Sequence, residues 1–184
     1  MSAKTATELG LQTGKWTIDP THSQIGFSAR HMMVSKVRGF FTEFSGDVEV
    51  AEDLTQSTVS VTIQSASITT RQTDRDNHVR SADFLDVENH PTLTFVSQSI
   101  SPKGSDYELT GALTIRGITN PVTFDLEFDS TGPDAYGGVR AGLNASTKIS
   151  RKAFGLEWNP ALETGGFVVA DEVKLEIEVE LVKA

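Results

Sequence analysis

The chain has 184 residues, no cysteine and a formal net charge of −9. This length suits a single domain whose core needs no disulfide bond. The lack of cysteine excludes thiol nucleophiles and thiolate metal sites. An acidic surface repels phosphate backbones, which argues against nucleic acid as a partner. No run approaches the ~20 apolar residues that span a bilayer, so we expect no stable membrane insertion.

The first stretch, residues 1–14, holds no apolar core of signal-peptide length. We expect it to be a flexible polar leader, followed by one domain over residues 15–184. The expected location is the cytoplasm. A periplasmic or secreted protein whose start had been engineered would show the same sequence.

From Trp16 onward, apolar residues recur at every second position in run after run. This alternation gives each strand one apolar and one polar face, and it predicts strands at residues 15–19, 22–31, 38–50, 56–68, 92–101, 105–116, 119–130, 136–150 and 172–183. Short connections rich in Gly, Pro and Asn favour antiparallel neighbours. A sandwich or a barrel could bury such faces, and the long strands favour the barrel. We therefore predict an all-β fold: a single eight-stranded antiparallel up-and-down barrel, lipocalin-like, with one short helix in the central crossover.

Two segments interrupt the alternation. Residues 70–91 are dense in charge, and Thr73 with Asp76 resembles a capping box, which predicts one or two helical turns over residues 74–81. Residues 151–166 form a 16-residue loop with several apolar side chains, and loops of this length are often functional. We expect residues 74–86 and 151–166 to gate the barrel.

The inward faces mix large apolar residues with small ones such as Gly111, Ala141 and Ala145. Small residues leave room for a ligand, although a tapered barrel also uses them merely to fit. Periodicity alone does not separate a packed core from a ligand-lining wall, because every barrel needs an apolar inward set. That set comprises Ile25, Phe27, Phe41, Val59, Val61, Ile63, Leu93, Phe95, Leu113, Ile115, Phe124 and Leu143.

The polar residues indicate no catalytic or metal site. The four histidines lack the spacing of a helical metal site. His22 and Ser23 point to opposite faces of one strand, so they cannot form a base–nucleophile pair. The charges of residues 75–86 form a solvated or mutually paired face; alternatively, Arg75 or Arg80 meets a ligand head group.

One tryptophan and three glycines are expected to have structural roles. Trp16 is expected to plug the base of the barrel rather than clamp a ligand. Gly39, Gly111 and Gly117 are expected at bulges and turns rather than at a recognition site.

The order of the residues resembles the YceI-like family in five successive blocks. The opening block runs from Trp16 to His31 (WTIDPTHSQIGFSARH), and Val37–Phe41 continues it. The later blocks lie within residues 67–95, 111–122 and 150–156. The resemblance covers about Gly14 to Val182, and five ordered blocks are far more specific than one short motif.

The resemblance implies a lipocalin-like barrel that binds, transports or sequesters a long-chain amphiphile in its lumen. The implied ligands are polyisoprenoids, quinones or polyprenyl phosphates, with fatty amides as a further class. It implies no enzymatic activity, no catalytic residue, no metal and no required cofactor. We also expect Phe84 and Phe154 in the lumen wall, and His31, Arg75 and Arg80 at the mouth near the ligand head group. A homodimer is left open.

Two alternatives use the same barrel. One is an enzyme that acts on a lipidic or quinone substrate in the cavity, for which His31 is the best acid–base candidate. The other is a barrel with a solid interior whose role lies in interactions at its surface.

Overall fold

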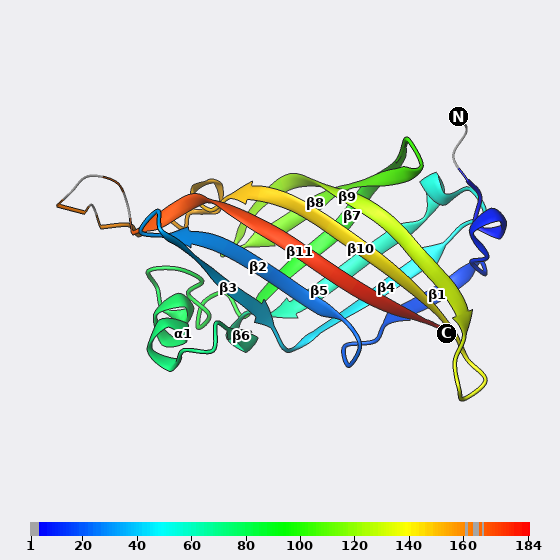
Figure 1. Cartoon of the computed structure of the whole chain (residues 1–184), viewed down its shortest axis with the longest axis horizontal. Helices are drawn as coiled ribbons and strands as arrows, with labels where there is room; N and C mark the ends of the chain where they lie inside the picture. The colour runs from blue at the N-terminus through cyan, green and yellow to red at the C-terminus, as the bar shows by residue number, and fades with distance from the viewer. Residues whose placement is uncertain (1–3, 161, 164–165, 167) are drawn as a thin grey trace.

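The structure is a computed structural model that describes residues 4–160, 162–163, 166 and 168–184. Figure 1 shows long strands coiled around a common axis, with one short helix, α1 (Thr73–Arg80), at one end. The strands are β1 (Gly14–Ile18), β2 (Gln24–His31), β3 (Ser35–Phe41), β4 (Phe44–Val50), β5 (Thr58–Gln64), β6 (Ile68–Thr69), β7 (Thr92–Lys103), β8 (Asp106–Ile115), β9 (Ile118–Pro133), β10 (Val139–Ser150) and β11 (Val169–Lys183).

The strands close into an antiparallel barrel. β1 and β2 both pair with β11, at its end and at its beginning, so together they act as one bent strand. β3 and β4 form a second bent strand, because β3 pairs with β2 and β4 pairs with β1. On their other side β3 pairs with β6 and β4 with β5, so β5 and β6 form a third. These three composite strands and the five strands β7 to β11 make eight, each beside its neighbour in the chain, and β1 closes the ring on β11. The predicted eight-stranded up-and-down barrel is confirmed.

The predicted unbroken strand over residues 38–50 is wrong. β3 ends at Phe41 and β4 begins at Phe44, and both phenylalanines are buried. Three positions apart, they cannot lie on one face of a regular strand, so the chain bends between them. The same three-residue spacing breaks the predicted strand 56–68, where the short 3₁₀ turn η3 (Ser65–Ser67) begins at buried Ser65 and is followed by buried Ile68.

The helix forms where predicted, but its cap differs from the predicted one. Gln72 is the N-cap residue, and its side-chain oxygen accepts a hydrogen bond from the Arg75 amide. Asp76 does not reach back to Thr73. Its carboxylate accepts hydrogen bonds from the backbone amide and hydroxyl of Thr70, at 2.7 and 2.5 Å. The helix is thereby fixed to the end of β6, at the barrel end called here the mouth.

The opposite end, called here the base, is closed by the segment expected to be a loose leader. Residues 7–9 form a 3₁₀ turn, η1, and Ala6 and Leu11 are buried in the core. The Ala6 amide donates to the Glu52 carbonyl at 3.0 Å, and the Tyr107 hydroxyl donates to the Lys4 carbonyl at 2.7 Å. The few apolar residues here lie too far apart for a recognisable period, which is why the polar composition misled.

Two of the three singled-out glycines make room for phenyl rings. A Cβ on Gly39 would lie 2.4 Å from Cζ of Phe27, and one on Gly111 would lie 2.4 Å from Cζ of Phe95. Gly39 is therefore neither a bulge nor a turn, contrary to the prediction, whereas Gly111 lies opposite a register shift in β7. Gly117, with φ +73°, forms the β8–β9 turn as predicted.

Candidate functional site

The barrel encloses a cavity of about 570 Å³. This volume falls within the range of about 300–1,000 Å³ typical of small-molecule sites. The cavity extends from Leu9 and Leu54 at the base to His78 and Trp158 at the mouth. Many inward side chains of β5, β10 and β11 keep partial accessibility, because they border the cavity rather than one another.

The predicted lumen wall lines this cavity with one exception. The cavity is bordered by Ile25, Phe27, Phe41, Val59, Val61, Ile63, Phe84, Leu93, Phe95, Leu113, Ile115, Phe124 and Leu143. Phe154 is not among its lining residues. It lies in the turn η4 (Lys152–Phe154), is only 2% exposed, and belongs to the packed core. The Asn120 side chain donates to the Ala153 carbonyl at 2.8 Å and so holds η4 against β9.

The predicted lumen wall contained no residue of β11. Its inward residues Val173, Leu175, Ile177, Val179 and Leu181 form one continuous side of the cavity. They occupy alternate positions in the clearest period-two run of the chain, so the alternation could have found them. Trp16, expected as a base plug, is fully buried, and its indole donates to the Gln12 carbonyl at 2.9 Å.

Of the three residues expected at the mouth, two line the cavity. His31 ends β2 and follows Ala29 and Phe27 on the inward face. Arg75 also lines it; its Nε donates to the Thr70 hydroxyl at 2.8 Å and its Nη2 to the Thr70 carbonyl at 3.0 Å. Arg80 does not line the cavity.

The Arg80 guanidinium instead fastens the helix to the preceding strand. Its Nε donates to the Ala66 carbonyl at 2.9 Å and its Nη2 to the Ile68 carbonyl at 2.8 Å. Arg80 therefore does not lie where it could contact a ligand head group in the cavity, contrary to the expectation. One of these carbonyls belongs to the turn η3 and the other to β6, so the guanidinium joins the helix to both.

An aromatic cluster joins the two segments predicted as gates. The ring centroids of His78 and Trp158 lie 4.5 Å apart, and those of Phe84 and Trp158 lie 5.4 Å apart. The His78 imidazole is held by Asp83, with Nε2 and Oδ2 2.8 Å apart. All three rings line the cavity, so one side of the mouth is an aromatic wall built from both segments. Residues 161 and 164–165 of the second segment lie outside the described residues.

Arg151 holds the second segment in place. Its guanidinium is almost fully buried and donates to the carbonyls of Ala170, Val169 and Trp158 at 2.9, 3.2 and 3.0 Å. Burial lowers its pKa, although a guanidinium stays charged in proteins. The part of the loop that carries Trp158 is thus anchored to β11. This role was not predicted from the sequence, because a charged residue at the start of a loop is usually exposed to solvent.

The polar groups of the cavity gather at the mouth. Arg30, His31, Asp74, Arg75 and His78 border it there. The walls and the base are formed by aliphatic and aromatic side chains, apart from groups such as the Tyr107 hydroxyl, which is already bonded to Lys4. This distribution fits an amphiphile whose tail lies inside and whose polar head lies at the mouth.

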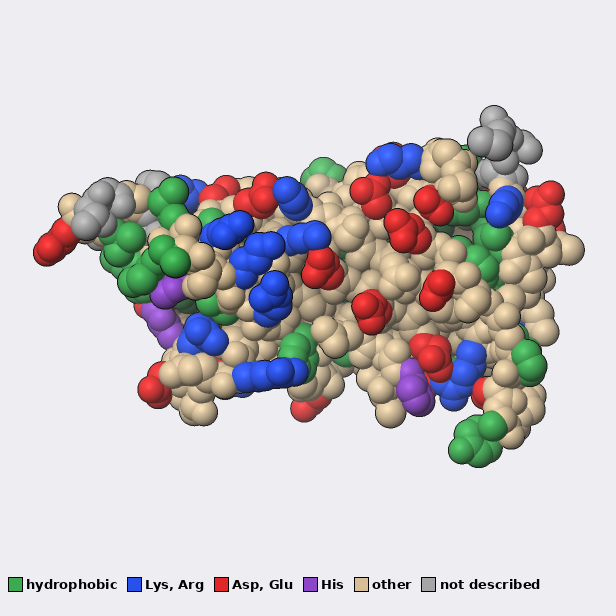
Figure 2. Space-filling view, in the orientation of Figure 1, with side chains coloured by type: hydrophobic (Ala, Val, Ile, Leu, Met, Phe, Trp, Pro, Cys, Tyr) green, Lys and Arg blue, Asp and Glu red, His purple; other side chains and the backbone are tan. Residues whose placement is uncertain are grey.

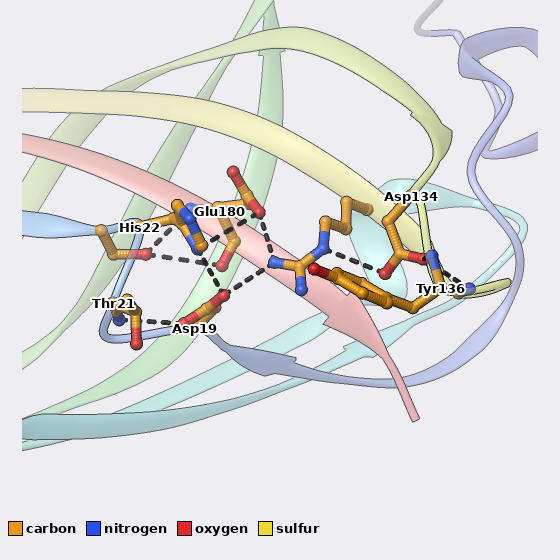
Figure 3. Close-up of polar contacts among 9 residues, drawn as sticks. Asp19, Thr21, His22, Asp134, Tyr136 and Glu180 are labelled. Carbon is orange, nitrogen blue, oxygen red and sulfur yellow. Dashed lines mark hydrogen bonds and ion pairs between the residues drawn. The ribbon is translucent and has the colours of Figure 1, made fainter.

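A second polar cluster lies at the barrel base, outside the cavity lining (Figure 3). Asp19, His22 and Glu180 are the described residues whose ligand atoms lie close enough for a metal ion, within 4.8 Å of one another. The Arg140 guanidinium already pairs with both carboxylates, 2.7 Å from Asp19, and with Asp134 at 3.1 Å. A fixed cation therefore takes the place that a metal would need, and the cluster fastens the β1–β2 corner to β10 and β11.

The hydrogen bonds of this cluster act on the Asp19 carboxyl. Hydrogen bonds from His22 and then Arg140 hold the pKa of Asp19 far below its usual 3.8. His22 and Ser23 precede β2, which begins at Gln24 rather than at the predicted residue 22. The Ser23 hydroxyl contacts the Glu180 backbone, donating to its carbonyl and accepting from its amide at 2.9 Å. His22 and Ser23 therefore serve the fold.

No helix among the described residues has the length and apolar character needed to cross a bilayer.

Comparisons with known proteins agree with this architecture. The family model described as the YceI-like domain matches residues 16–181. A Staphylococcus epidermidis protein described as a UPF0312 protein is 39% identical over 171 residues, covering 90% of this chain and 96% of its own. The crystal structure of Burkholderia cenocepacia BcnA is similar with a TM-score of 0.78 and 27% identity, covering 89% of this chain and 98% of its own.

A more distant structure shares the fold. A polyisoprenoid binding domain from Saccharophagus degradans aligns with a TM-score of 0.69 at 15% identity, over 92% of this chain and 98% of its own. At this identity the likeness concerns the fold alone. The family model and the Staphylococcus relative both extend over nearly all of the chain, and on them the assignment rests: this chain belongs to the YceI-like family.

Proposed function

We propose that the protein binds one long-chain amphiphile, a polyisoprenoid, quinone, polyprenyl phosphate or acyl chain, and carries or sequesters it without chemical change. The observation that supports this most is the apolar cavity of about 570 Å³ that extends along the barrel. A small polar metabolite would leave most of such a wall in contact with water. The polyisoprenoid class is put first because a barrel of the same fold is named for it.

The size of the cavity bounds the energetics. At about 30 Å³ for each water-sized group, 570 Å³ holds on the order of 20 such groups. Each buried methylene contributes about 0.8 kcal/mol, so a chain that fills the space gains about 15 kcal/mol before costs. Association and ordering cost about 4–15 kcal/mol. Only a chain that fills most of the cavity therefore binds tightly.

The mouth sets the preference for a head group. The Arg75 guanidinium is pinned by Thr70 yet borders the cavity, and His78 is oriented by Asp83. Both side chains can donate to oxygen, which favours a head group that carries oxygen acceptors, such as a quinone carbonyl or a phosphate.

The enzyme alternative has little support in the geometry. Among the described side chains, none forms a hydrogen bond with the His31 imidazole that would orient it as a base. His78 is oriented, but by Asp83 and two rings on the wall rather than beside a nucleophile. We therefore propose binding without turnover.

The test begins with protein purified under native conditions and extracted with organic solvent. Mass spectrometry of the extract should find a long-chain amphiphile at about one per barrel. Titration of the delipidated protein with a quinone, a polyprenyl phosphate and a fatty amide of matched chain length then ranks the head groups. Failure to take up any long-chain probe would contradict the proposal. Conversion of a bound molecule that His31→Ala abolishes, with the fold kept, would favour the enzyme.

A further inference from the structure

The hairpin between β2 and β3 exposes an apolar tip at the mouth. Met32, Met33 and Val34 are 45%, 73% and 83% exposed. Met32 and Met33 also adopt φ of 51° and 60°, a left-handed conformation that Gly, Asn or Asp normally supplies in such turns. A hairpin selected for stability alone would contain neither the exposed apolar groups nor this conformation, so the tip indicates a partner.

A basic face adjoins this tip. Arg30 lies directly opposite Lys36, and Arg38 lies opposite Ser28, which on its other side lies opposite Lys174. Like charges directly opposite one another destabilise a sheet. Figure 2 shows Lys and Arg side chains gathered over the end of β2, β3 and β11 that lies beside a hydrophobic patch, while Asp and Glu are more numerous on the other half of this face.

The basic face is only partly neutralised within the protein. Lys174 pairs with Glu176 at 2.6 Å. The pKa of Glu176 is lowered mainly by this contact, with smaller contributions from Lys36 and Arg38. Among the described residues, Arg30, Lys36 and Arg38 form no ion pair of their own. Lys174, Lys36 and Arg38 thus act on the one carboxylate of Glu176. In a chain whose net charge is −9, this face carries a local excess of positive charge.

The tip and the basic face border the opening of the cavity. His31, immediately before the tip, lines the cavity, and so does Val168, whose carbonyl accepts a hydrogen bond from the Met32 amide at 2.8 Å. A surface that contacted the tip and the basic face together would therefore lie across the mouth. Apolar side chains flanked by Lys and Arg bind the interface of anionic bilayers, where the apolar groups enter the headgroup region and the cations meet phosphates.

We propose that the mouth end docks on an anionic lipid bilayer. Met32, Met33 and Val34 enter the headgroup region while Arg30, Lys36 and Arg38 contact lipid phosphates. The acidic base is repelled by the same surface, which orients the barrel mouth-first. Docking lets a chain pass between bilayer and lumen without crossing water; this consequence rests on the proposed function, whereas docking itself does not.

Co-sedimentation with vesicles tests the docking. Delipidated protein is mixed with vesicles of phosphatidylcholine alone or of phosphatidylcholine with phosphatidylglycerol, at low and at high salt. We expect binding to the anionic vesicles that high salt weakens. Lys36→Glu with Arg38→Glu should weaken it by more than about 25-fold, since each basic residue near such a surface accounts for about fivefold. Met33→Ser with Val34→Ser should weaken it at both salt concentrations.

Matched controls change the same groups at the base. Lys15→Glu with Lys103→Glu alters the net charge equally at side chains that are 62% and 55% exposed, and Tyr136→Ser removes an exposed apolar group that is 92% exposed. These variants should bind the anionic vesicles as the wild type does. Equal binding to both vesicle types, no binding at all, or equal weakening by the base variants would overturn the proposal.

A second readout separates docking from ligand binding. A fluorescent long-chain probe is delivered either from anionic vesicles or from a cyclodextrin complex in solution. The mouth variants should slow uptake from vesicles at least tenfold and leave the solution affinity unchanged, whereas equal rates from vesicles would overturn docking as the loading route. No uptake from cyclodextrin by the wild type would overturn the proposed function and leave vesicle binding as the test of docking.

Discussion

Replacing one small inward-facing residue with a large one tests whether the barrel is hollow or solid. Ala145 of β10 lines the cavity between Leu126 of β9 and Ile177 of β11. Ala145→Phe adds a phenyl ring, which takes the space of about five water-sized groups, on the order of 150 Å³ at about 30 Å³ each. That is roughly a quarter of the 570 Å³ available.

Two magnitudes follow from this volume. Displacing about five methylenes of a bound chain, at about 0.8 kcal/mol each, removes up to about 4 kcal/mol of binding free energy, or as much as a thousandfold in affinity. The ligand-free barrel should keep its stability or gain slightly, because the ring fills empty space. A solid interior would instead be overpacked, at a cost of about 1–3 kcal/mol.

The assay pairs urea unfolding of the delipidated variant with titration of a long-chain probe. Ser146→Phe, the next residue on the same strand and on the opposite face, is the matched control and should leave probe affinity unchanged. Loss of 1–3 kcal/mol of stability by Ala145→Phe, with its affinity for the probe unaltered, would refute the hollow-barrel reasoning.

Three further predictions concern single residues. Phe27→Arg should abolish uptake of an apolar chain by placing a charge in the lumen, and unchanged binding with a normal fold, checked by circular dichroism, would remove Phe27 from the site. Gly39→Ala should destabilise the fold by about 1–3 kcal/mol in urea unfolding, because its Cβ would lie 2.4 Å from the Phe27 ring, whereas Gly132→Ala, with nothing within 4 Å, should change little; equal effects would contradict this account. Asp19, whose pKa is lowered from 3.8 in the folded state, stabilises the protein fully above about pH 4 and loses that contribution as the pH falls toward the lowered value. Unfolding midpoints of Asp19→Asn should therefore depend less on acid than those of the wild type, and an identical acid dependence would argue against the pairing with Arg140.

The alternation of residues predicted the barrel because a strand has a strict period of two and this chain keeps it over long runs. The same rule explains the failures. Phe41 and Phe44 are both apolar but three apart, and the local sequence around them gives no turn signal to mark the break. Ala6 and Leu11 close the base through contacts with distant segments, which no local pattern reveals.

The apolar lining of the cavity was easier to predict from the sequence than the polar residues at its mouth. The alternation of inward and outward positions along each strand pointed to apolar residues that border the cavity. Phe154 lies in a 3₁₀ turn, where this alternation does not apply. The polar positions were harder to predict, because Arg75 and Arg80 are five residues apart on one helix yet donate to different backbone carbonyls, those of Thr70 and Ile68. Their roles depend on how a helix sits on a strand end, which spacing does not encode.

The most direct measurement is a crystal structure of the protein with a long isoprenoid or acyl chain that carries bromine at its apolar end. The account predicts one anomalous bromine peak inside the barrel near Leu9 and Leu54, with the head group at the mouth beside Arg75. Bromine on the outer surface, or a lumen in which side chains meet across the axis with no chain between them, would contradict it.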